Sequence, residues 1–231
     1  MEIHGLNKTT LLDYPEHVAA TVFTGGCNFR CPFCHNSELV LAPGGQPAFS
    51  EEEVLAFLKK RRGLLEGVCI TGGEPTLQPD LEGFIGKVKE LGYRVKLDTN
   101  GYRPEVLERL LKAGLLDYAA MDVKASRDNY GRAAGLPEIS LNRIERSIEL
   151  LKNCSIDYEF RTTVVKGIHS VEEFGEIGKW LSGARAYYLQ SYRENENVLC
   201  QGFEAFSKEE LEAMAALAHR YVDRVGLRGV E

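Results

Sequence analysis

The stretch from residue 24 to residue 34 reads Thr24-Gly25-Gly26-Cys27-Asn28-Phe29-Arg30-Cys31-Pro32-Phe33-Cys34. Its three cysteines are spaced C-x3-C-x2-C, and no fourth lies nearby, since the next are Cys69, Cys154 and Cys200. An iron–sulfur cubane normally takes four thiolates, so a cubane bound by these three would keep one iron without a protein ligand. An open metal position is where a small molecule can bind and react. The stretch therefore predicts a reactive cluster rather than a structural one.

Three other interpretations of these cysteines remain open on spacing alone. Cys31 and Cys34 could form a redox dithiol of the thioredoxin kind, and Cys31-x-x-Cys34-His35 also matches a c-type haem attachment site. A zinc site that uses His35 is the third, although neighbouring residues rarely turn both side chains onto one metal. Haem attachment normally requires export, and the dithiol interpretation leaves Cys27 unexplained. The remaining cysteines show no paired spacing for a second cluster.

Short apolar runs alternate with amphipathic helical patterns along the whole chain. Strand-then-helix repetition predicts an α/β fold with parallel strands and right-handed crossovers. Six such units are too few for a closed eight-stranded barrel, and they fit either a partial barrel or an open doubly wound sheet. Three helices carry capping boxes, at Ser50-x-x-Glu53, Ser170-x-x-Glu173 and Ser207-x-x-Glu210. The predicted strands are Ala19–Thr24, Gly67–Thr71, Arg94–Asp98, Tyr118–Asp122, Asp157–Val165 and Ala186–Gln190.

Polar motifs follow the first four predicted strands, one after each. In both candidate architectures, ligands bind at the carboxyl ends of parallel strands. We therefore expect the four motifs to meet at one rim of the sheet. They are the cysteine stretch, Thr71-Gly72-Gly73-Glu74-Pro75, Asp98-Thr99-Asn100-Gly101 and Asp122-Val123-Lys124.

The glycine pair at positions 72 and 73 removes side chains where the chain turns after a strand. Glycines let a backbone approach a ligand closely, and Glu74 beside them could accept a hydrogen bond from an ammonium group. An ordinary strand-to-helix turn also uses glycines, and the pattern alone does not separate the two interpretations.

Charged residues after the later strands also have two interpretations each. Asp98-Thr99-Asn100-Gly101 has the composition of a turn, and its carboxylate and amide also suit contacts to a sugar or a cation. Asp122 and Lys124 point to one face of a strand, either toward a ligand or into a simple salt bridge. Arg161 could turn inward to pair with a ligand carboxylate, or it could lie at an edge facing water.

Length and charge fit one α/β domain of ordinary size. The 231 residues carry a net charge of −6, and a mildly acidic chain is not expected to bind nucleic acid, which draws on clustered Lys and Arg. The N-terminus has no long apolar run, so we expect no signal peptide and no membrane span. The predicted location is the cytoplasm, where thiols stay reduced. We expect residues 1–231 to form a single domain, with its core at about 18–192 and a C-terminal helix at about 207–223.

In combination, these motifs resemble the radical S-adenosylmethionine (radical SAM) superfamily. C-x3-C-x2-C is the cluster motif of that superfamily, here with Phe33 as the aromatic residue before the last cysteine, and Gly72-Gly73-Glu74 matches its second motif. The order of these two motifs and Asp98-Thr99-Asn100-Gly101 is highly specific. The resemblance runs from Asp13 to about the sixth predicted strand. It implies a partial (β/α)6 barrel of the TIM type, the radical SAM core.

Narrower features are similar to the activating enzymes of glycyl radical enzymes. These features are Cys34-His35-Asn36, Asp98-Thr99-Asn100-Gly101 and Met121-Asp122-Val123-Lys124. The opening Thr10-Leu11-Leu12-Asp13-Tyr14-Pro15, followed by the cysteine stretch, resembles the compact activating proteins of anaerobic ribonucleoside-triphosphate reductases. Only 37 residues separate Cys34 from Gly72, and no extra cysteine pair lies among them. An inserted ferredoxin-like domain is therefore not expected, and no physical reason for His35-Asn36 follows from the sequence.

The resemblance implies a [4Fe–4S] cluster and S-adenosylmethionine (SAM) as bound groups. Cys27, Cys31 and Cys34 would hold the cluster, and the amino and carboxylate groups of SAM would chelate its open iron. Residues Gly72-Gly73-Glu74 would contact the methionine amine, and the main chain of Phe33 would contact adenine.

The resemblance also implies a charged subsite near the SAM carboxylate. Asp98, Thr99 and Asp122 would bind a monovalent cation there, with Lys124 adjacent. Arg161 would belong to the same binding set.

The implied activity is radical generation for another protein. A flavodoxin or ferredoxin would supply one electron that cleaves the sulfonium of SAM, and the 5′-deoxyadenosyl radical would abstract hydrogen from a glycine of a partner, here anaerobic ribonucleoside-triphosphate reductase. The alternatives are an activating enzyme of formate-lyase type and a small-molecule radical SAM enzyme of deazapurine-synthase type. A thiol oxidoreductase is the alternative outside radical chemistry.

Overall fold

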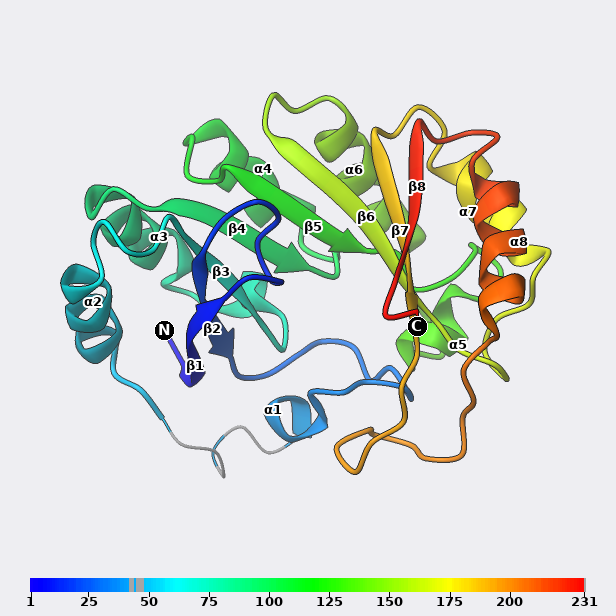
Figure 1. Ribbon diagram of the computed structural model, residues 1–231, viewed down its shortest axis with the longest axis horizontal. Helices are drawn as coiled ribbons and strands as arrows, with labels where there is room; N and C mark the ends of the chain where they lie inside the picture. Colours follow the sequence, from blue (N-terminus) through cyan, green and yellow to red (C-terminus); the bar gives the residue numbers. More distant parts are fainter. Residues whose placement is uncertain (42–43, 45–47, 231) are drawn as a thin grey trace.

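The computed structural model describes residues 1–41, 44 and 48–230. Within these residues the backbone forms an eight-stranded sheet in which each strand lies beside its neighbour in sequence, from β1 to β8 (Figure 1). β1 is antiparallel to β2, and all later pairs are parallel. The strands are β1 Ile3–Thr10, β2 Ala19–Thr24, β3 Gly67–Gly72, β4 Arg94–Thr99, β5 Tyr118–Asp122, β6 Asp157–Val164, β7 Ala186–Ser191 and β8 Arg224–Arg228.

The strand order decides between the two architectures that the sequence left open. A doubly wound sheet reverses its strand order at a switch point, whereas the order here never reverses. Figure 1 shows the strands forming a curved sheet, with helices on its outer side. β1 and β8 end the sheet and do not pair with each other in the described part of the chain. The fold is therefore a partial barrel, and the predicted α/β class with a TIM-like core is confirmed.

The six predicted strands correspond to β2–β7 and agree with them to within one residue at each end. The two outer strands are absent from the prediction. β1 exposes the run Asn7, Lys8 and Thr9, and β8 is five residues long with an arginine at each end. An edge strand has a neighbour on one side only, so neither of them carries the apolar run that marks the inner strands.

Helices follow most of the strands and cover the outer face of the sheet. None of the described helices is both long and apolar enough to cross a lipid bilayer. The helical segments are α1 Ser37–Leu41, α2 Glu51–Lys60, the short 3-10 helix η2 Pro75–Leu77, α3 Leu81–Glu90, α4 Pro104–Lys112, α5 Tyr130–Ala134, α6 Leu141–Lys152, α7 Glu173–Trp180 and α8 Lys208–Ala218.

Two of the three predicted capping boxes are confirmed. Ser50 and Ser207 each accept a hydrogen bond from the main chain three residues on, at the starts of α2 and α8. The box predicted at Ser170 is wrong, because α7 begins one residue after Glu172 without any side-chain cap. The carboxylate of Glu173 accepts from Ser126 N instead (2.7 Å), so a tertiary contact takes the group that the local pattern assigned to the cap.

The C-terminal helix is shorter than predicted. α8 ends at Ala218 rather than near residue 223, and the chain then turns into β8. Asp223 N donates to Ala184 O (3.1 Å) and fixes this turn. Val222 continues the helical spacing of apolar residues, but the turn buries it instead, with 1% of its surface exposed.

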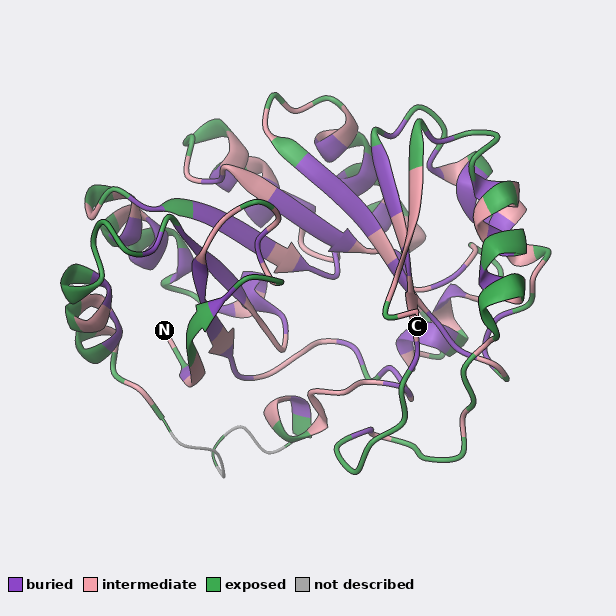
Figure 2. Ribbon diagram, viewed as in Figure 1, coloured by how far each residue is buried: buried purple, intermediate pink, exposed green. Residues whose placement is uncertain are grey.

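The two faces of the sheet differ in chemistry. Along β4, Val95 and Leu97 belong to the buried hydrophobic core that the helices complete. Lys96 and Asp98 alternate with them, so they lie on the inner face of the barrel, where they form an ion pair. Figure 2 shows that the strand centres are mostly buried. The barrel thus has an apolar outer layer and a charged interior.

An ion pair ties the last strand to this interior. Arg228 on β8 donates through Nη1 and Nη2 to the carboxylate of Glu159 on β6, over 2.6 and 2.8 Å. The hydroxyl of Tyr118 donates to the same carboxylate (2.8 Å). Glu159 is fully buried, so these contacts are shielded from water and hold β8 in place across β7.

Candidate active site

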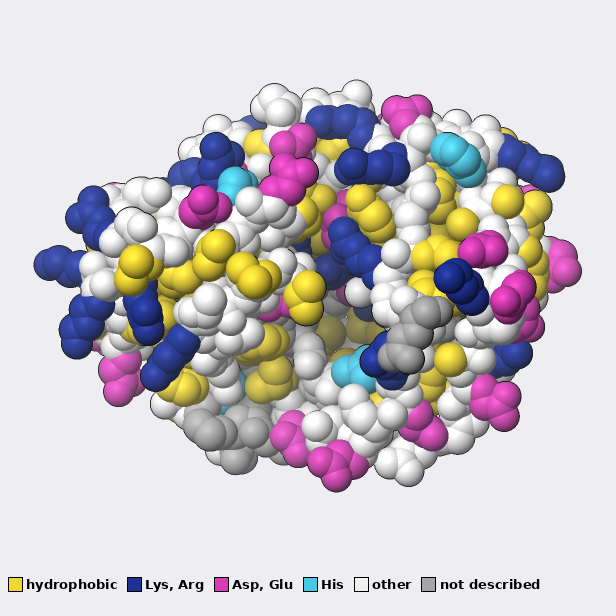
Figure 3. Space-filling view, viewed as in Figure 1, with side chains coloured by type: hydrophobic (Ala, Val, Ile, Leu, Met, Phe, Trp, Pro, Cys, Tyr) yellow, Lys and Arg dark blue, Asp and Glu magenta, His cyan; other side chains and the backbone are white. Residues whose placement is uncertain are grey.

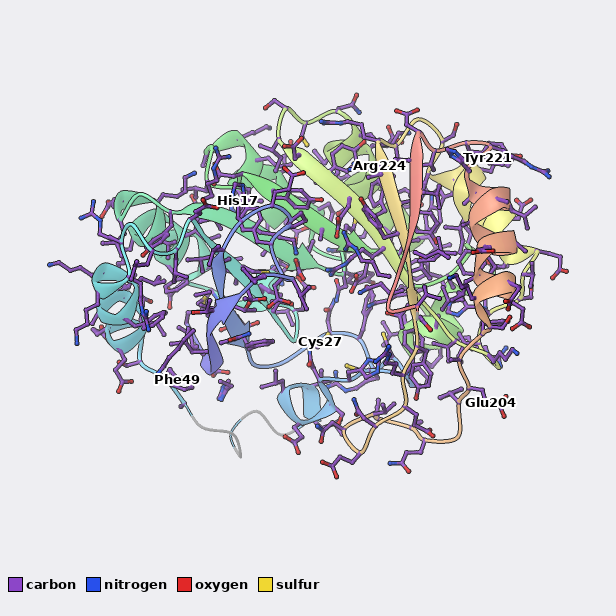
Figure 4. All side chains as sticks on the ribbon, in the orientation of Figure 1. His17, Cys27, Phe49, Glu204, Tyr221 and Arg224 are labelled. Atoms are coloured by element: carbon purple, nitrogen blue, oxygen red, sulfur yellow. The ribbon has the colours of Figure 1, made fainter. Side chains whose placement is uncertain are left out.

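A cavity of about 270 Å³ lies at the carboxyl ends of the strands. Figure 4 labels Cys27 at this end of the sheet and His17 near the other end, and Figure 3 shows the molecule hollowed at its centre, with Lys and Arg side chains beside the hollow. The structure brings all twelve predicted site residues to this cavity, although what each one binds stays a prediction. They are Cys27, Cys31, Phe33, Cys34, Gly72, Gly73, Glu74, Asp98, Thr99, Asp122, Lys124 and Arg161.

The cysteine loop follows β2 and is fixed by main-chain hydrogen bonds. Arg30 N donates to Ala134 O (2.9 Å), and Cys34 N donates to Cys31 O (3.0 Å). Cys31 is buried, and Cys27 and Cys34 are partly buried. The loop therefore has a defined shape that the protein itself supplies.

Two observations weigh against the other interpretations of these cysteines. Burial raises the pKa of the Cys27 thiol to about 12 and that of the Cys31 thiol to about 11, whereas a redox dithiol needs a lowered thiol pKa. His35 Nε2 donates to the carbonyl oxygen of Arg193 (2.6 Å), so that nitrogen has no lone pair for a metal. The contact of His35 does not support a zinc site through this nitrogen, and the raised pKa of the Cys31 thiol does not favour a redox dithiol.

The chain after β7 folds back over the cysteine loop, and we call residues 192–206 the cover segment. Leu199 N donates to Cys34 O (3.1 Å), and Cys200 N donates to Pro32 O (2.8 Å). The contact from His35 to the main chain of this segment belongs to the same interface. His35 therefore has a structural role that the sequence did not reveal.

The glycine pair is required by the backbone itself. Gly72 has a φ of +111°, a region that side chains disfavour. A Cβ on Gly73 would lie far inside contact distance of the carbonyl oxygen of Gly26 in the cysteine loop. Gly73 N donates to Thr24 O and Glu74 N donates to Gly26 O, both over 2.8 Å. The end of β3 thus lies directly against the start of the cysteine loop. This contact alone requires the glycines, whether or not a ligand also approaches them.

Glu74 ties the end of β3 to the end of β4, with 1% of its surface exposed. Its Oε1 accepts from Thr99 Oγ1 (2.7 Å) and Thr76 N (3.1 Å), and its Oε2 accepts from Asn100 N (2.7 Å). Burial raises the pKa of this carboxyl against the effect of these hydrogen bonds. Protein donors already occupy both oxygens of this buried side chain, so the main chain of the motif is the part left for a ligand ammonium.

Two carboxylates and three cations form a charged cluster on the inner wall of the barrel. Arg161 Nε donates to Asp122 Oδ1 (3.0 Å), and its Nη1 donates to Asp98 Oδ2 (3.1 Å). Lys124 Nζ donates to Asp122 Oδ2 (3.0 Å), and Lys96 Nζ donates to Asp98 Oδ1. Of the two interpretations of Arg161, the inward one is therefore correct, and Asp122 and Lys124 do form an ion pair.

Charge pairing keeps these groups ionised despite their burial. Burial opposes ionisation of Asp122, but Arg161 and Lys124 outweigh it and lower its pKa to about 2. The pKa of Asp98 is lowered in the same way, by Arg161 and Lys96 against burial. Burial also opposes the charge on Lys124, and Asp122 outweighs it and raises the pKa of that amine. Asp98, Asp122 and Lys124 are therefore charged at neutral pH.

The donors around the cavity fit a cluster together with SAM. Three thiols are the soft ligands that iron–sulfur clusters take, and the other three cysteines do not line the cavity. The main-chain N–H and C=O of Phe33 make no hydrogen bond in the described part of the chain. Free polar groups of this kind are what a bound ligand satisfies.

No three His, Cys, Asp or Glu side chains among the described residues are grouped so that they could hold one metal ion. A cubane imposes no such requirement, because each of its cysteines binds a different iron atom. Three cysteines in this spacing are thus compatible with a cluster.

Some residues that line the cavity are absent from the predicted set. Thr163 lies two positions after Arg161 on β6 and so on the same face of the strand. Gln190 lies near the end of β7. Period-two alternation and the strand-end rule could have found both. Asn36 stood in a quoted motif without a role, and its Nδ2 donates to Gly72 O (2.9 Å).

Known proteins are similar to this chain over much of its length. A family model described as the Radical SAM superfamily matches residues 21–181. A Methanocaldococcus jannaschii protein, provisionally named a glycyl-radical enzyme activating enzyme, is 33% identical over 238 residues, which cover 99% of this chain and 96% of that protein. A second protein of that organism with the same provisional naming is 29% identical over 168 residues, 70% of this chain and 62% of its own length.

Solved structures share the fold at low sequence identity. A structure of TYW1 with a lysine-pyruvate adduct bound has a TM-score of 0.62 at 17% identity, over 87% of this chain and 73% of that one. Streptococcus suis SuiB bound to S-adenosylmethionine has a TM-score of 0.67 at 16% identity, over 89% of this chain and 49% of that one. The chain thus spans about half the length of SuiB, and these likenesses show a common fold.

Proposed function

Since the chain belongs to the radical SAM superfamily of enzymes, we propose that it is an activating enzyme that generates a glycyl radical in a partner enzyme. The observation that carries the proposal is the convergence of the cysteine loop and three strand-end motifs on one cavity. The naming of the two Methanocaldococcus jannaschii relatives supports it. The finer proposal is that the partner is an anaerobic ribonucleoside-triphosphate reductase, which rests on the compact pattern between Thr10 and Cys31.

The cofactors are a [4Fe–4S] cluster and SAM. Cys27, Cys31 and Cys34 would hold the cluster on the loop that the cover segment shields. When bound, the cluster and SAM together supply one-electron bond-cleavage chemistry, which no protein side chain could provide. The protein holds the bound groups in position and shields them from water, and the cysteine loop contributes to both. The charged side chains of the inner wall supply the electrostatic environment.

Main-chain groups and cations would orient SAM. Phe33 offers a free N–H and C=O to adenine, and the strand end at Gly72-Gly73-Glu74 offers main-chain oxygens to the ammonium group. Lys124 and Arg161 line the same cavity, where a carboxylate would meet two positive charges. Binding adenine at one end of SAM and the amino and carboxylate groups at the other would fix the sulfonium between them.

An electron donor and a reducing compartment complete the proposal. A flavodoxin or ferredoxin would deliver the single electron. The location we propose is the cytoplasm, and it is supported by the cysteines, all six of which are described and are free thiols.

Anaerobic reconstitution with iron, sulfide, SAM and the candidate reductase tests this function. We expect 5′-deoxyadenosine and, by electron paramagnetic resonance, a glycyl radical on the reductase. Cys31→Ala should lose both signals, whereas Cys154→Ala, which changes a cysteine outside the cavity, should keep both.

Each alternative gives a different result in this experiment. A radical that appears on a formate-lyase type partner but not on the reductase would assign the chain to another activating enzyme. 5′-Deoxyadenosine with a small-molecule substrate and no protein radical would favour the small-molecule class. Protein that stays colourless after reconstitution would contradict the cluster itself.

A further inference from the structure

The three residues expected to bind a monovalent cation are already engaged by the protein. All four carboxylate oxygens of Asp98 and Asp122 accept a hydrogen bond from a cationic nitrogen of Arg161, Lys124 or Lys96. The hydroxyl of Thr99 donates to Glu74 and accepts from Gly101 N (3.1 Å). The expected cation site and the observed donor pattern therefore do not fit each other.

The charge of the cluster points the same way. Two carboxylates face three cations, which are Arg161, Lys124 and Lys96. This group of charged side chains therefore has one excess positive charge before any ligand binds. An added alkali ion would raise this excess in a site where the side chain of Arg161 is 13% exposed and that of Asp98 is 14% exposed. Like charges that are partly shielded from water repel each other strongly. This group of charged side chains therefore favours an anion and not a further cation.

Arg161 is placed midway between the two carboxylates, where the ion was expected. Its Nε and Nη1 each bind one aspartate, and this planar fork fixes the distance between them. Its third nitrogen, Nη2, makes no hydrogen bond within the described part of the chain. Arg161 also lines the cavity, so one guanidinium edge is available to an anionic group.

We propose that Arg161 replaces the monovalent cation of this site. It neutralises the pair Asp98 and Asp122 from inside the protein and presents its free edge to the carboxylate of SAM. SAM binding by this chain is then independent of alkali ions. The proposal rests on SAM binding, which family membership supplies, and not on the identity of the protein partner.

The test is the affinity of cluster-loaded protein for SAM in different salts at one ionic strength. Dissociation constants are measured by equilibrium dialysis in tetramethylammonium, sodium and potassium chloride. For the wild-type protein we expect values that agree within about twofold. Sodium or potassium that tightens wild-type binding by about tenfold would overturn the proposal.

Variants at Arg161 separate its charge from its shape. Arg161→Gln should weaken SAM binding by about tenfold or more in tetramethylammonium chloride, because a hydrogen bond to a charged group is lost. Sodium or potassium should restore part of that affinity, since the two carboxylates then lack their bridging cation. Arg161→Gln that binds SAM as tightly as wild type, or that shows no alkali response, would contradict the proposal.

Two further measurements keep the result independent of folding defects and of catalysis. Arg161→Lys retains the positive charge and should show a smaller loss than Arg161→Gln, with little alkali response. Crystals soaked in thallium(I), a potassium substitute with anomalous scattering, should show no peak between Asp98 and Asp122 in the wild-type protein. A peak there would reject the proposal even if no glycyl radical is ever observed.

Discussion

Asn100 connects the end of β4 to the cysteine loop through one side chain. Its Nδ2 donates to Asn28 Oδ1 (2.8 Å) and lies 3.8 Å from Cys27 Sγ. Its Oδ1 accepts from Tyr102 N (3.0 Å), which fixes the orientation of the amide. An N–H group directed at a ligating sulfur stabilises the more negative, reduced form of an iron–sulfur cluster.

Asn100→Leu should therefore lower the reduction potential of the bound cluster. A hydrogen bond of about 0.5–1.5 kcal/mol corresponds to a shift of roughly 20–60 mV for one electron. The measurement is a redox titration followed by electron paramagnetic resonance, with Asn153→Leu, outside the cavity, as control. A potential that is unchanged or raised in Asn100→Leu would show that the amide does not act on the sulfur.

The contact between Gly73 and Gly26 gives a second prediction at this scale. Gly73→Ala places a methyl group against the carbonyl oxygen of Gly26 and should displace the start of the cysteine loop. We expect less than half of the wild-type iron content after reconstitution. The matched control is Gly83→Ala in α3, where a Cβ meets nothing within 4 Å. This control should be stabilised by about 0.5–1 kcal/mol, and iron content equal to wild type in Gly73→Ala would contradict the close approach.

At the scale of elements, the edge strand β8 depends on a buried ion pair. Burial opposes ionisation of Glu159, but Arg228 outweighs it, so the pKa of this carboxyl lies below its usual value. A carboxyl with a lowered pKa stabilises the fold above its unfolded value of about 4.3 and loses that contribution as pH falls through the folded value.

Glu159→Gln should thus destabilise the cluster-free protein by about 3 kcal/mol at pH 7, as expected for a buried pair that loses one partner. The difference from wild type should be constant from pH 7 to 5 and should shrink below about pH 4, because the unfolded wild-type chain then takes up a proton at this carboxyl, which the folded state resists. Urea unfolding at each pH measures both quantities. Glu149→Gln, which breaks an exposed pair with Lys152, should cost no more than about 0.5 kcal/mol. A difference that persists unchanged at pH 3.5 would refute the assignment.

Local sequence patterns predicted the inner strands well and the outer ones not at all. An inner strand such as β3 is buried on both sides, so Val68 and Ile70 belong to a continuous apolar run. β8 is stabilised by the contact between Arg228 and Glu159, which are 69 positions apart, and no local pattern records such a contact. The wrong prediction of a capping box at Ser170 has the same origin, since the carboxylate of Glu173 accepts a hydrogen bond from Ser126, which is 47 positions away.

At the scale of the whole molecule, the first and last thirds of the chain meet at the cysteine loop. The cover segment donates from Leu199 N and Cys200 N to carbonyl oxygens on either side of Phe33. Cluster binding should rigidify the loop, and the shared hydrogen bonds should pass this order on to the cover segment.

Hydrogen exchange of cluster-loaded and cluster-free protein measures this coupling. Peptides that span residues 192–206 should exchange at least about tenfold more slowly once the cluster is bound, because local opening must then break an additional interaction. Helix α2, which lies apart from the cover segment in Figure 1, should exchange at the same rate in both forms. Equal rates for the cover segment in both forms would show that the two regions are independent.

The position of the site could be predicted from the sequence, whereas its internal contacts could not. Parallel strands bring their carboxyl ends to one rim, so a list of strand-end motifs is enough to place Cys27, Glu74, Asp98 and Asp122 together. Which of these groups pair depends on side-chain geometry across different strands. The bridge that Arg161 forms between two aspartates was invisible for this reason, and it changes the expected chemistry of the cation subsite.

Because β1 and β8 never join, the molecule is a crescent and not a ring. A closed barrel would admit a ligand only along its axis, past the loops at the carboxyl ends of the strands. An open barrel also admits a ligand through the gap between its two edge strands. A folded partner protein could therefore insert a protruding loop there without a change in either backbone. Closing this gap with an engineered cross-link between the two terminal strands would then exclude a macromolecule and still let a nucleoside in.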